Sequence, residues 1–168
     1  MPKTTDIVIN TVPIIAIVAA LGDLRVLQIY RRVWVPFEVW QEISAGGAAQ
    51  FAVAEFEAAH WLQKRTSPLH LAPVLLNTLD RGEAAVIQLA LDEDVQTVCI
   101  DEAAGRRIAR LNGLSVTGSV GVLLRALNEG HRFSMREAID RMMAQGIWLS
   151  DRVIDFALAQ AGEESEAS

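Results

Sequence analysis

The sequence predicts an α/β fold with an open parallel sheet, and three observations support this. Residues 82–118 indicate an amphipathic helix, a buried strand, a second helix and a short second strand. Residues 6–10, DIVIN, are rich in β-branched side chains and alternate little, as expected of a central strand covered on both faces. A chain of 168 residues with 51% hydrophobic content can bury roughly 70% of its unfolded surface, which suffices for one core.

Upstream of residue 82, the pattern predicts one further strand and four helices. The helices are expected over residues 14–21, 23–32, 37–44 and 51–65, and the strand over 33–36. Pro13 favours a helix start, because its fixed φ suits the first turn, and Gly22 favours a helix end. Residues 46–50 are expected to form a flexible break, and residues 66–79 a connector.

Downstream of residue 118, three helices complete the chain. The first is expected to be capped by Ser119 and to end at Gly130. The last two are expected to form a C-terminal helical hairpin over residues 131–162, packed on the sheet. We therefore expect a single domain over residues 1–162, followed by an acidic and disordered tail, 163–168.

Charge and composition limit the function classes. A net charge of −6 argues against a broad electrostatic grip on nucleic acid, so an RNA substrate would need a local basic patch or a bound cation. The lone Cys99 has no disulfide partner, which fits a reducing compartment. The uncharged run 7–22 is interrupted by Asn10 and Pro13 and falls short of the roughly 20 apolar residues of a membrane span. We expect a cytoplasmic protein without a transmembrane helix.

Several common catalytic motifs are missing from the sequence. The three histidines lack the spacing of zinc ligands. No G-x-S-x-G elbow, Walker loop or G-x-G-x-x-G follows a predicted strand, so the usual hydrolase, NTPase and dinucleotide signatures are excluded.

Acidic residues stand where an open parallel sheet binds its ligands. Glu83 lies at a helix start and Asp101 at the carboxyl end of a strand, and ligands of such sheets bind just outside the strand ends. Carboxylates crowded into one crevice repel each other by roughly 4 kcal/mol per close pair at an effective dielectric near 20, so a cation must compensate them. Mg²⁺ or Mn²⁺ suits such oxygen ligands.

Each candidate residue also has a structural alternative. Asp80 and Glu83 have the spacing of a capping box, and Asp101 could cap the helix that follows it. Asn10 stands at a strand-to-helix corner, where its side chain could cap helix-start amides. Glu42 is either a further acid aimed at the strand ends or an ordinary exposed helix glutamate.

Four segments in order resemble the PIN-like nuclease superfamily: INTVPIIAI, VPFEVWQEI, LDRGEAAVIQLAL and CIDEAAGRRIARLNGLSVTG. The chain is most similar to a poorly characterised prokaryotic branch, whose first strand ends D-T-S-P-L-I and which carries G-E-A-x-A-I and a D-[DE] pair. The resemblance covers about residues 6–125, and the C-terminal hairpin also fits this branch.

The resemblance implies a three-layer α/β/α fold with a mostly parallel sheet, a Mg²⁺- or Mn²⁺-dependent ribonuclease site, and often a toxin role beside an antitoxin protein. Carried over position by position, the metal ligands fall on Asn10, Glu42, Glu83 and Asp101, with Glu102 as a neighbour. Asn10 departs from the family pattern, because an amide replaces the first acid. The final acid of some PIN nucleases would fall near Gly118 or Ser119, where none stands.

Two functions from different classes follow. The first is an endoribonuclease in which Glu83, Asp101 and Glu42 hold divalent ions and Asn10 assists. Thr11 would then contact water or phosphate, and Arg106 and Arg110 would hold the RNA backbone. The second is a PIN-like binding module without turnover, for RNA or an antitoxin-like protein, which Asn10 and the negative net charge favour. Apolar helix faces lead us to expect a homodimer.

Overall fold

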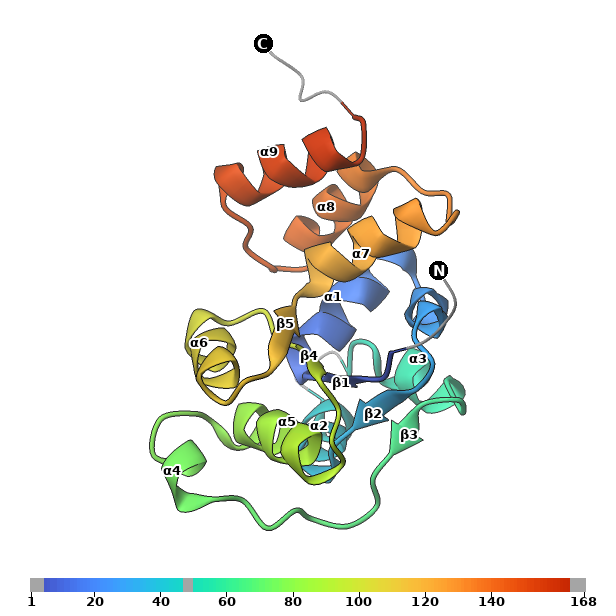
Figure 1. Ribbon diagram of the computed structural model, residues 1–168. Coiled ribbons are helices and arrows are strands. Elements are labelled where there is room, and N and C mark those ends of the chain that lie inside the picture. The colour runs from blue at the N-terminus through green and yellow to red at the C-terminus, as the bar shows by residue number, and fades with distance from the viewer. Residues whose placement is uncertain (1–4, 47–49, 164–168) are drawn as a thin grey trace.

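A five-stranded sheet forms the centre of the protein, with the strand order β3-β2-β1-β4-β5 (Figure 1). The structure is a computed structural model that describes residues 5–46 and 50–163. Within these residues every strand pair of the sheet is parallel. The strands are β1 (Ile7–Ile9), β2 (Val33–Val35), β3 (Gln63–Lys64), β4 (Thr97–Cys99) and β5 (Ser115–Thr117). The middle of the predicted break, 47–49, and most of the predicted tail, 164–168, lie outside the described residues.

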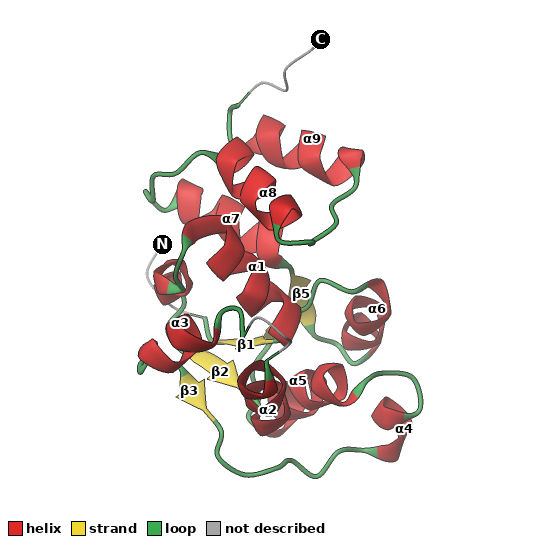
Figure 2. Ribbon diagram, turned by 180° about the vertical axis from the view of Figure 1, so that it is seen from behind, coloured by secondary structure: helices red, strands yellow, loops and turns green. Residues whose placement is uncertain are grey.

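Helices cover both faces of the sheet, which confirms the expected three-layer α/β/α architecture. α1 and α7 lie on one face and α2 and α5 on the other, as the two opposite views show (Figures 1 and 2). The helices are α1 (Thr11–Leu21), α2 (Phe37–Ala45), α3 (Val53–Ala58), α4 (Pro73–Leu76), α5 (Arg81–Asp92), α6 (Ala103–Leu111), α7 (Ser119–Asn128), α8 (Met135–Ala144) and α9 (Asp151–Gln160), with a 3-10 helix η1 (Arg25–Ile29) after α1. None of these helices is both long enough and apolar enough to cross a membrane.

The central strand β1 sets the position of the candidate site. Its three residues are fully buried, as the β-branched sequence predicts. β1 pairs with β2 on one side and β4 on the other, so Ile9 lies opposite Cys99. Because these strands are parallel, their carboxyl ends share one edge of the sheet. Asn10 and Ile100 therefore follow their strands at the same edge.

The last helices pack on α1 through a second apolar cluster. Leu123 of α7, Met135 and Met142 of α8 and Leu158 of α9 are all buried there, together with Ala16 of α1. Small residues on α1 let α8 approach it closely. The expected C-terminal helical hairpin is thus α8 followed by α9, which contact each other on the α1 side of the sheet (Figure 1).

Three expected elements differ in the structure. The predicted helix over residues 51–65 is wrong: α3 ends at Ala58, and residues 63 and 64 pair with β2 instead. At Gln63 and Lys64, hydrogen bonds to β2 replace the hydrogen bonds of a helix. Local periodicity cannot reveal such pairing with a distant strand. Residues 23–32 form only the short η1, and the predicted connector 66–79 contains α4.

Candidate metal centre

Asn10 occupies the N-cap position of α1, but its side chain makes no capping hydrogen bond. The alternative that it caps helix-start amides is therefore wrong. Its Oδ1 is buried and has no hydrogen-bond partner among the described residues. An unsatisfied buried oxygen costs about 1–3 kcal/mol, so this atom is suited to a ligand that the chain itself does not supply.

Glu83 lies in the first turn of α5, where one half of the expected capping box is present. The backbone N–H of Glu83 donates a 2.8 Å hydrogen bond to Oδ1 of Asp80. The Glu83 side chain is buried, and its Oε1 has no partner among the described residues. Burial, a hydrogen bond with the Glu102 carboxyl and the charges of Asp80 and Glu102 raise the pKa of Glu83 to about 8. The carboxylate form thus lacks a compensating positive charge.

Three carboxyl groups converge at this point of the molecule. Ligand oxygens of Asp80, Glu83 and Glu102 all lie within 4.8 Å of one another. Glu83 is buried, whereas Asp80 and Glu102 are exposed, so the group opens to solvent. From its sequence pattern, Asp80 was expected only to cap the helix that starts after it. Its spacing of three residues from Glu83 could have revealed the second role, because residues three apart are neighbours on a helix.

Glu42 of α2 lies beside this group. Its Oε2 accepts a 2.7 Å hydrogen bond from the Thr11 hydroxyl. Burial raises the pKa of Glu42, as do the charges of Asp80 and Glu102, whereas the Thr11 hydrogen bond acts in the opposite direction. Gly82 makes room for this carboxylate, because a Cβ at Gly82 would collide with Oε1 of Glu42.

Asp101 follows β4 and is held by a different helix from the one expected. Its Oδ1 accepts a 2.7 Å hydrogen bond from the backbone N–H of Ser119, in the first turn of α7. The alternative that Asp101 caps its own helix is wrong, because Glu102 is the N-cap of α6. Ser119 is likewise not the cap of α7, because Gly118 holds that position. Burial raises the pKa of Asp101, and the contacts with Ser119 and the charge of Arg106 oppose that rise.

Gly118 is one of the two positions where some PIN nucleases would carry a further acid. A Cβ on Gly118 would lie 2.6 Å from Oδ1 of Asp101 and 2.9 Å from Nη1 of Arg106. Both distances are shorter than real Cβ contacts allow. A side chain at this position would therefore force the ends of the Asp101 and Arg106 side chains to shift, away from their hydrogen bonds to Ser119 and Ile100.

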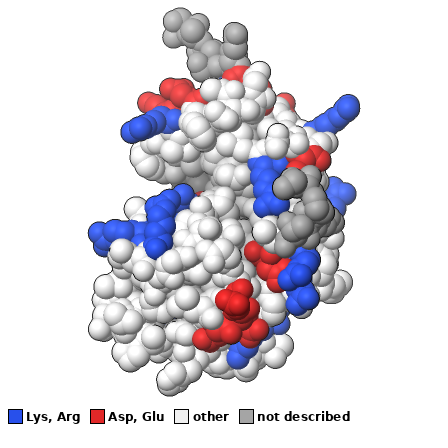
Figure 3. Space-filling model, viewed as in Figure 1, with Lys and Arg blue, Asp and Glu red and all other residues white. Residues whose placement is uncertain are grey.

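The two arginines expected to hold RNA differ in their surroundings. Nη1 of Arg106 donates a 2.8 Å hydrogen bond to the carbonyl of Ile100, so Arg106 ties α6 to the end of β4. Arg110 is exposed on α6, as is Arg107. Figure 3 shows basic side chains on the side of the molecule where α6 lies. These exposed guanidinium groups are free to meet phosphates.

The donor set fits a divalent cation that prefers oxygen. Two of the expected ligands, Glu83 and Glu102, fall in one group with Asp80, and Glu42 is close enough to be affected by their charges. Asp101 is outside that group and bonded to α7. The unpaired oxygens of Asn10 and Glu83 and the raised pKa of Glu83 are compatible with a group that binds a cation.

A family model described as a PIN domain matches residues 6–163, which is nearly the whole chain. No curated protein matches the chain closely enough to serve as a named relative.

Proposed function

Because the chain belongs to the PIN domain family, we propose that it is a divalent-metal-dependent endoribonuclease that uses the acidic group at the strand ends. The observation that carries this proposal is the convergence of Asp80, Glu83 and Glu102 within 4.8 Å. The unpaired oxygens of Asn10 and Glu83 support it further, because both are buried.

In this proposal, the carboxylates of Asp80, Glu83 and Glu102 hold Mg²⁺ or Mn²⁺, and Asn10 adds a neutral amide oxygen. A divalent ion bound there would supply positive charge for a phosphodiester and would lower the pKa of a water molecule. Glu42, oriented by the Thr11 hydroxyl, completes the acidic rim and accepts a proton from water or from the substrate. The pKa of Glu42 is already raised, which suits this exchange.

Asp101 and Arg106 act mainly as positioning residues. Asp101 connects the end of β4 to α7, and Arg106 connects α6 to the same strand end. Together they fix the start of α6, where Glu102 stands. The exposed Arg107 and Arg110 are the residues we propose for the RNA backbone, because the net charge of −6 leaves affinity for phosphate to local cations.

The finer features implied by the resemblance belong to the same proposal. We propose membership of the prokaryotic branch with the G-E-A-x-A-I motif, whose counterpart here opens α5. A cytoplasmic homodimer that acts as the toxin of a toxin–antitoxin pair is consistent with that branch. We also propose one PIN-like domain over residues 1–162, since the family match extends through the C-terminal hairpin.

A second candidate function is a binding module that has lost turnover. The amide of Asn10, which replaces a carboxylate, favours it, as does the absence of an acid at Gly118 and Ser119. RNA or an antitoxin-like protein would be its ligand. Cleavage that is absent in the natural protein and present in Asn10→Asp would favour this second function.

RNA cleavage tests the proposed enzyme. Single-stranded RNA is incubated with the protein and Mn²⁺, and the same reaction with excess EDTA gives the background. We expect Glu83→Gln to lose at least about a hundredfold in rate, since even a supporting residue of a metal site can cost that much. Glu93→Gln, at the exposed far end of α5, is the matched control and keeps full activity. Equal rates for wild type and Glu83→Gln would reject the enzyme.

A further inference from the structure

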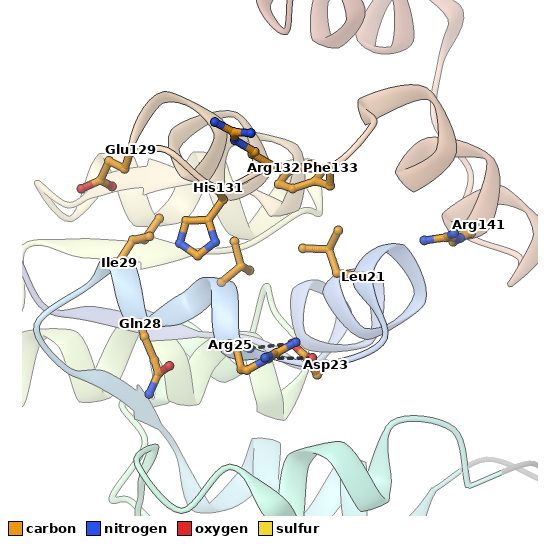
Figure 4. Close-up of a pocket in the computed structure, with 11 residues that line it drawn as sticks. Leu21, Asp23, Arg25, Gln28, Ile29, Glu129, His131, Arg132, Phe133 and Arg141 are labelled. Atoms are coloured by element: carbon orange, nitrogen blue, oxygen red, sulfur yellow. Dashed lines mark hydrogen bonds and ion pairs between the residues drawn. The ribbon is translucent and has the colours of Figure 1, made fainter.

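Glu42 is held in place without a positively charged partner. In the groove shown in Figure 4, where α1 ends, Asp23 and Glu129 each form a salt bridge with an arginine. Glu42 forms no salt bridge with any residue that the structure describes, and the charges of Asp80 and Glu102 repel it. The position of its carboxylate must therefore depend on other contacts.

Two contacts fix this carboxylate, one through each oxygen. Its Oε2 accepts the hydrogen bond from the Thr11 hydroxyl at the start of α1. Its Oε1 lies against the backbone of Gly82, in the first turn of α5. A Cβ on Gly82 would collide with Oε1 and would lie 3.1 Å from Cδ and 3.3 Å from Oε2 of Glu42. The Glu42 carboxylate thus fills the space of the side chain that position 82 lacks.

The backbone of Gly82 does not itself require a glycine. Gly82 lies within α5 and is not among the glycines with a positive φ. Glycine is less favourable than alanine inside a helix, because it loses more conformational entropy on folding. The three nearest heavy atoms that a Cβ at this position would meet all belong to Glu42. The need for a glycine here therefore comes from Glu42, on a different helix.

Gly105 of α6 is arranged in a similar way beside a second acid. A Cβ on Gly105 would lie 3.5 Å from Cδ of Glu83, which is an ordinary contact, and 2.9 Å from a methyl carbon of Ile100, which is too close. The Glu83 side chain thus packs against a part of α6 that carries no side chain. Two acids of the candidate site therefore lie against helix backbone.

We propose that Gly82 is a positioning residue of the metal centre, because its missing side chain lets Glu42 reach the acidic group from α2. This inference rests on the proposed metal centre but not on RNA cleavage. A Cβ at position 82 would push the Glu42 carboxylate aside and strain its hydrogen bond with Thr11. A divalent ion in the acidic group would then lose the attraction of one nearby negative charge.

Chemical denaturation in EDTA tests the steric part of this proposal. A change from glycine to alanine inside a helix normally stabilises a protein. Gly82→Ala should instead lower the denaturation midpoint, because its Cβ displaces Glu42. In a Glu42→Ala background the same substitution should raise the midpoint, since the obstructing carboxylate is gone. A shift in the same direction in both backgrounds would overturn the proposal.

Titration with Mn²⁺ tests the positioning role, which a purely structural contact would not affect. We expect Gly82→Ala to weaken Mn²⁺ binding about tenfold, as for other residues that orient a metal site, and to cause no further loss in Glu42→Ala. Gly121→Ala is the matched control. Its Cβ would collide equally closely with the Thr117 hydroxyl in the first turn of α7, so it should bind Mn²⁺ as the wild type does.

The outcomes separate this proposal from the nuclease. Equal Mn²⁺ affinity in the wild type and Gly82→Ala would overturn the positioning role and leave the metal centre standing. A wild type that binds no Mn²⁺ would overturn both. Weaker Mn²⁺ binding by Gly82→Ala, in a protein that does not cleave RNA, would support the positioning role and reject only the nuclease.

Discussion

The Thr11 hydroxyl donates a 2.7 Å hydrogen bond to Oε2 of Glu42, and so joins the first residue of α1 to a carboxylate of α2 beside the acidic group. This bond opposes the repulsion that Asp80 and Glu102 exert on Glu42. Thr11 was expected to contact water or phosphate. Its observed partner suggests that it orients an acid.

The first prediction concerns this bond. Thr11→Val keeps the shape of the side chain but removes the donor, so Glu42 should move away from the acidic group. We expect RNA cleavage and Mn²⁺ affinity to fall about tenfold, the usual range for a residue that orients a metal site. Thr11→Ser, which retains the hydroxyl, should restore most of both. Unchanged cleavage and affinity in Thr11→Val would show that the bond has no functional role.

The second prediction concerns Gly118. Gly118→Asp would place an acid where some PIN nucleases carry one, but its Cβ would press on Asp101 and Arg106. We expect the free energy of unfolding to fall by about 1–3 kcal/mol, as for other overpacked sites, without a gain in cleavage. Gly118→Ala should lose a similar amount, because the Cβ causes the clash. Chemical denaturation measures this loss.

Ser67→Asp is the control for Gly118→Asp. It adds the same charge at an exposed loop position after β3 and should leave stability unchanged. Faster cleavage by Gly118→Asp than by the wild type, at normal stability, would contradict the close packing around Asp101.

The third prediction concerns pH. The folded metal-free protein keeps a proton on Glu83 up to about pH 8, whereas the unfolded chain releases it near the ordinary pKa of 4.5. Folded protein thus binds more protons between these values, so stability should fall as pH rises through this window. Glu42 and Asp101, whose pKa values are also raised, act in the same direction. Thermal melts in EDTA from pH 5 to 8 measure the trend.

Other titrating groups do not obscure this effect. Asp6 and Glu163 have lowered pKa values, so their contribution to stability is lost only at more acidic pH, below the window. Glu83→Gln should flatten the trend, because it cannot release a proton. Saturating Mn²⁺ should stabilise the wild type more at pH 8 than at pH 5, since the ion competes with the proton. A wild-type protein that becomes more stable towards pH 8 in EDTA would contradict the raised pKa of Glu83.

Local sequence patterns predicted the layers of this fold well. The β-branched run before Asn10 predicted a strand, and the capping signal at Asp80 predicted a helix start. Both depend on neighbours in the sequence, and the structure has β1 and α5 at these places. The helix expected over residues 51–65 failed because Lys64 pairs with Val35, a partner far away in the sequence. Only the completed sheet makes that pairing more favourable than a helix.

The candidate site also combines features that local sequence predicts with contacts that it does not. Glu83 could be placed at the start of a helix, because the capping signal at Asp80 is visible in the sequence. Asp101 was predicted to be a metal ligand, with capping of its own helix as the alternative. It bonds instead to the backbone of Ser119, and no local sequence pattern encodes this contact. Asp80 was overlooked because one local role already explained it. One oxygen of Asp80 accepts a hydrogen bond from the backbone of Glu83, but the carboxylate also adds its charge to the group with Glu83 and Glu102.

Direct titration with Mn²⁺, followed by electron paramagnetic resonance, tests the metal centre most directly. We predict that the wild type binds the ion with submillimolar affinity, and that Glu83→Gln weakens binding at least about tenfold. Glu93→Gln, at the C-cap of α5 and so at the opposite end of this helix from Glu83, should bind as the wild type does. A wild type that binds no Mn²⁺ at millimolar concentration, or that binds it no better than Glu83→Gln does, would contradict a metal site at Asp80, Glu83 and Glu102.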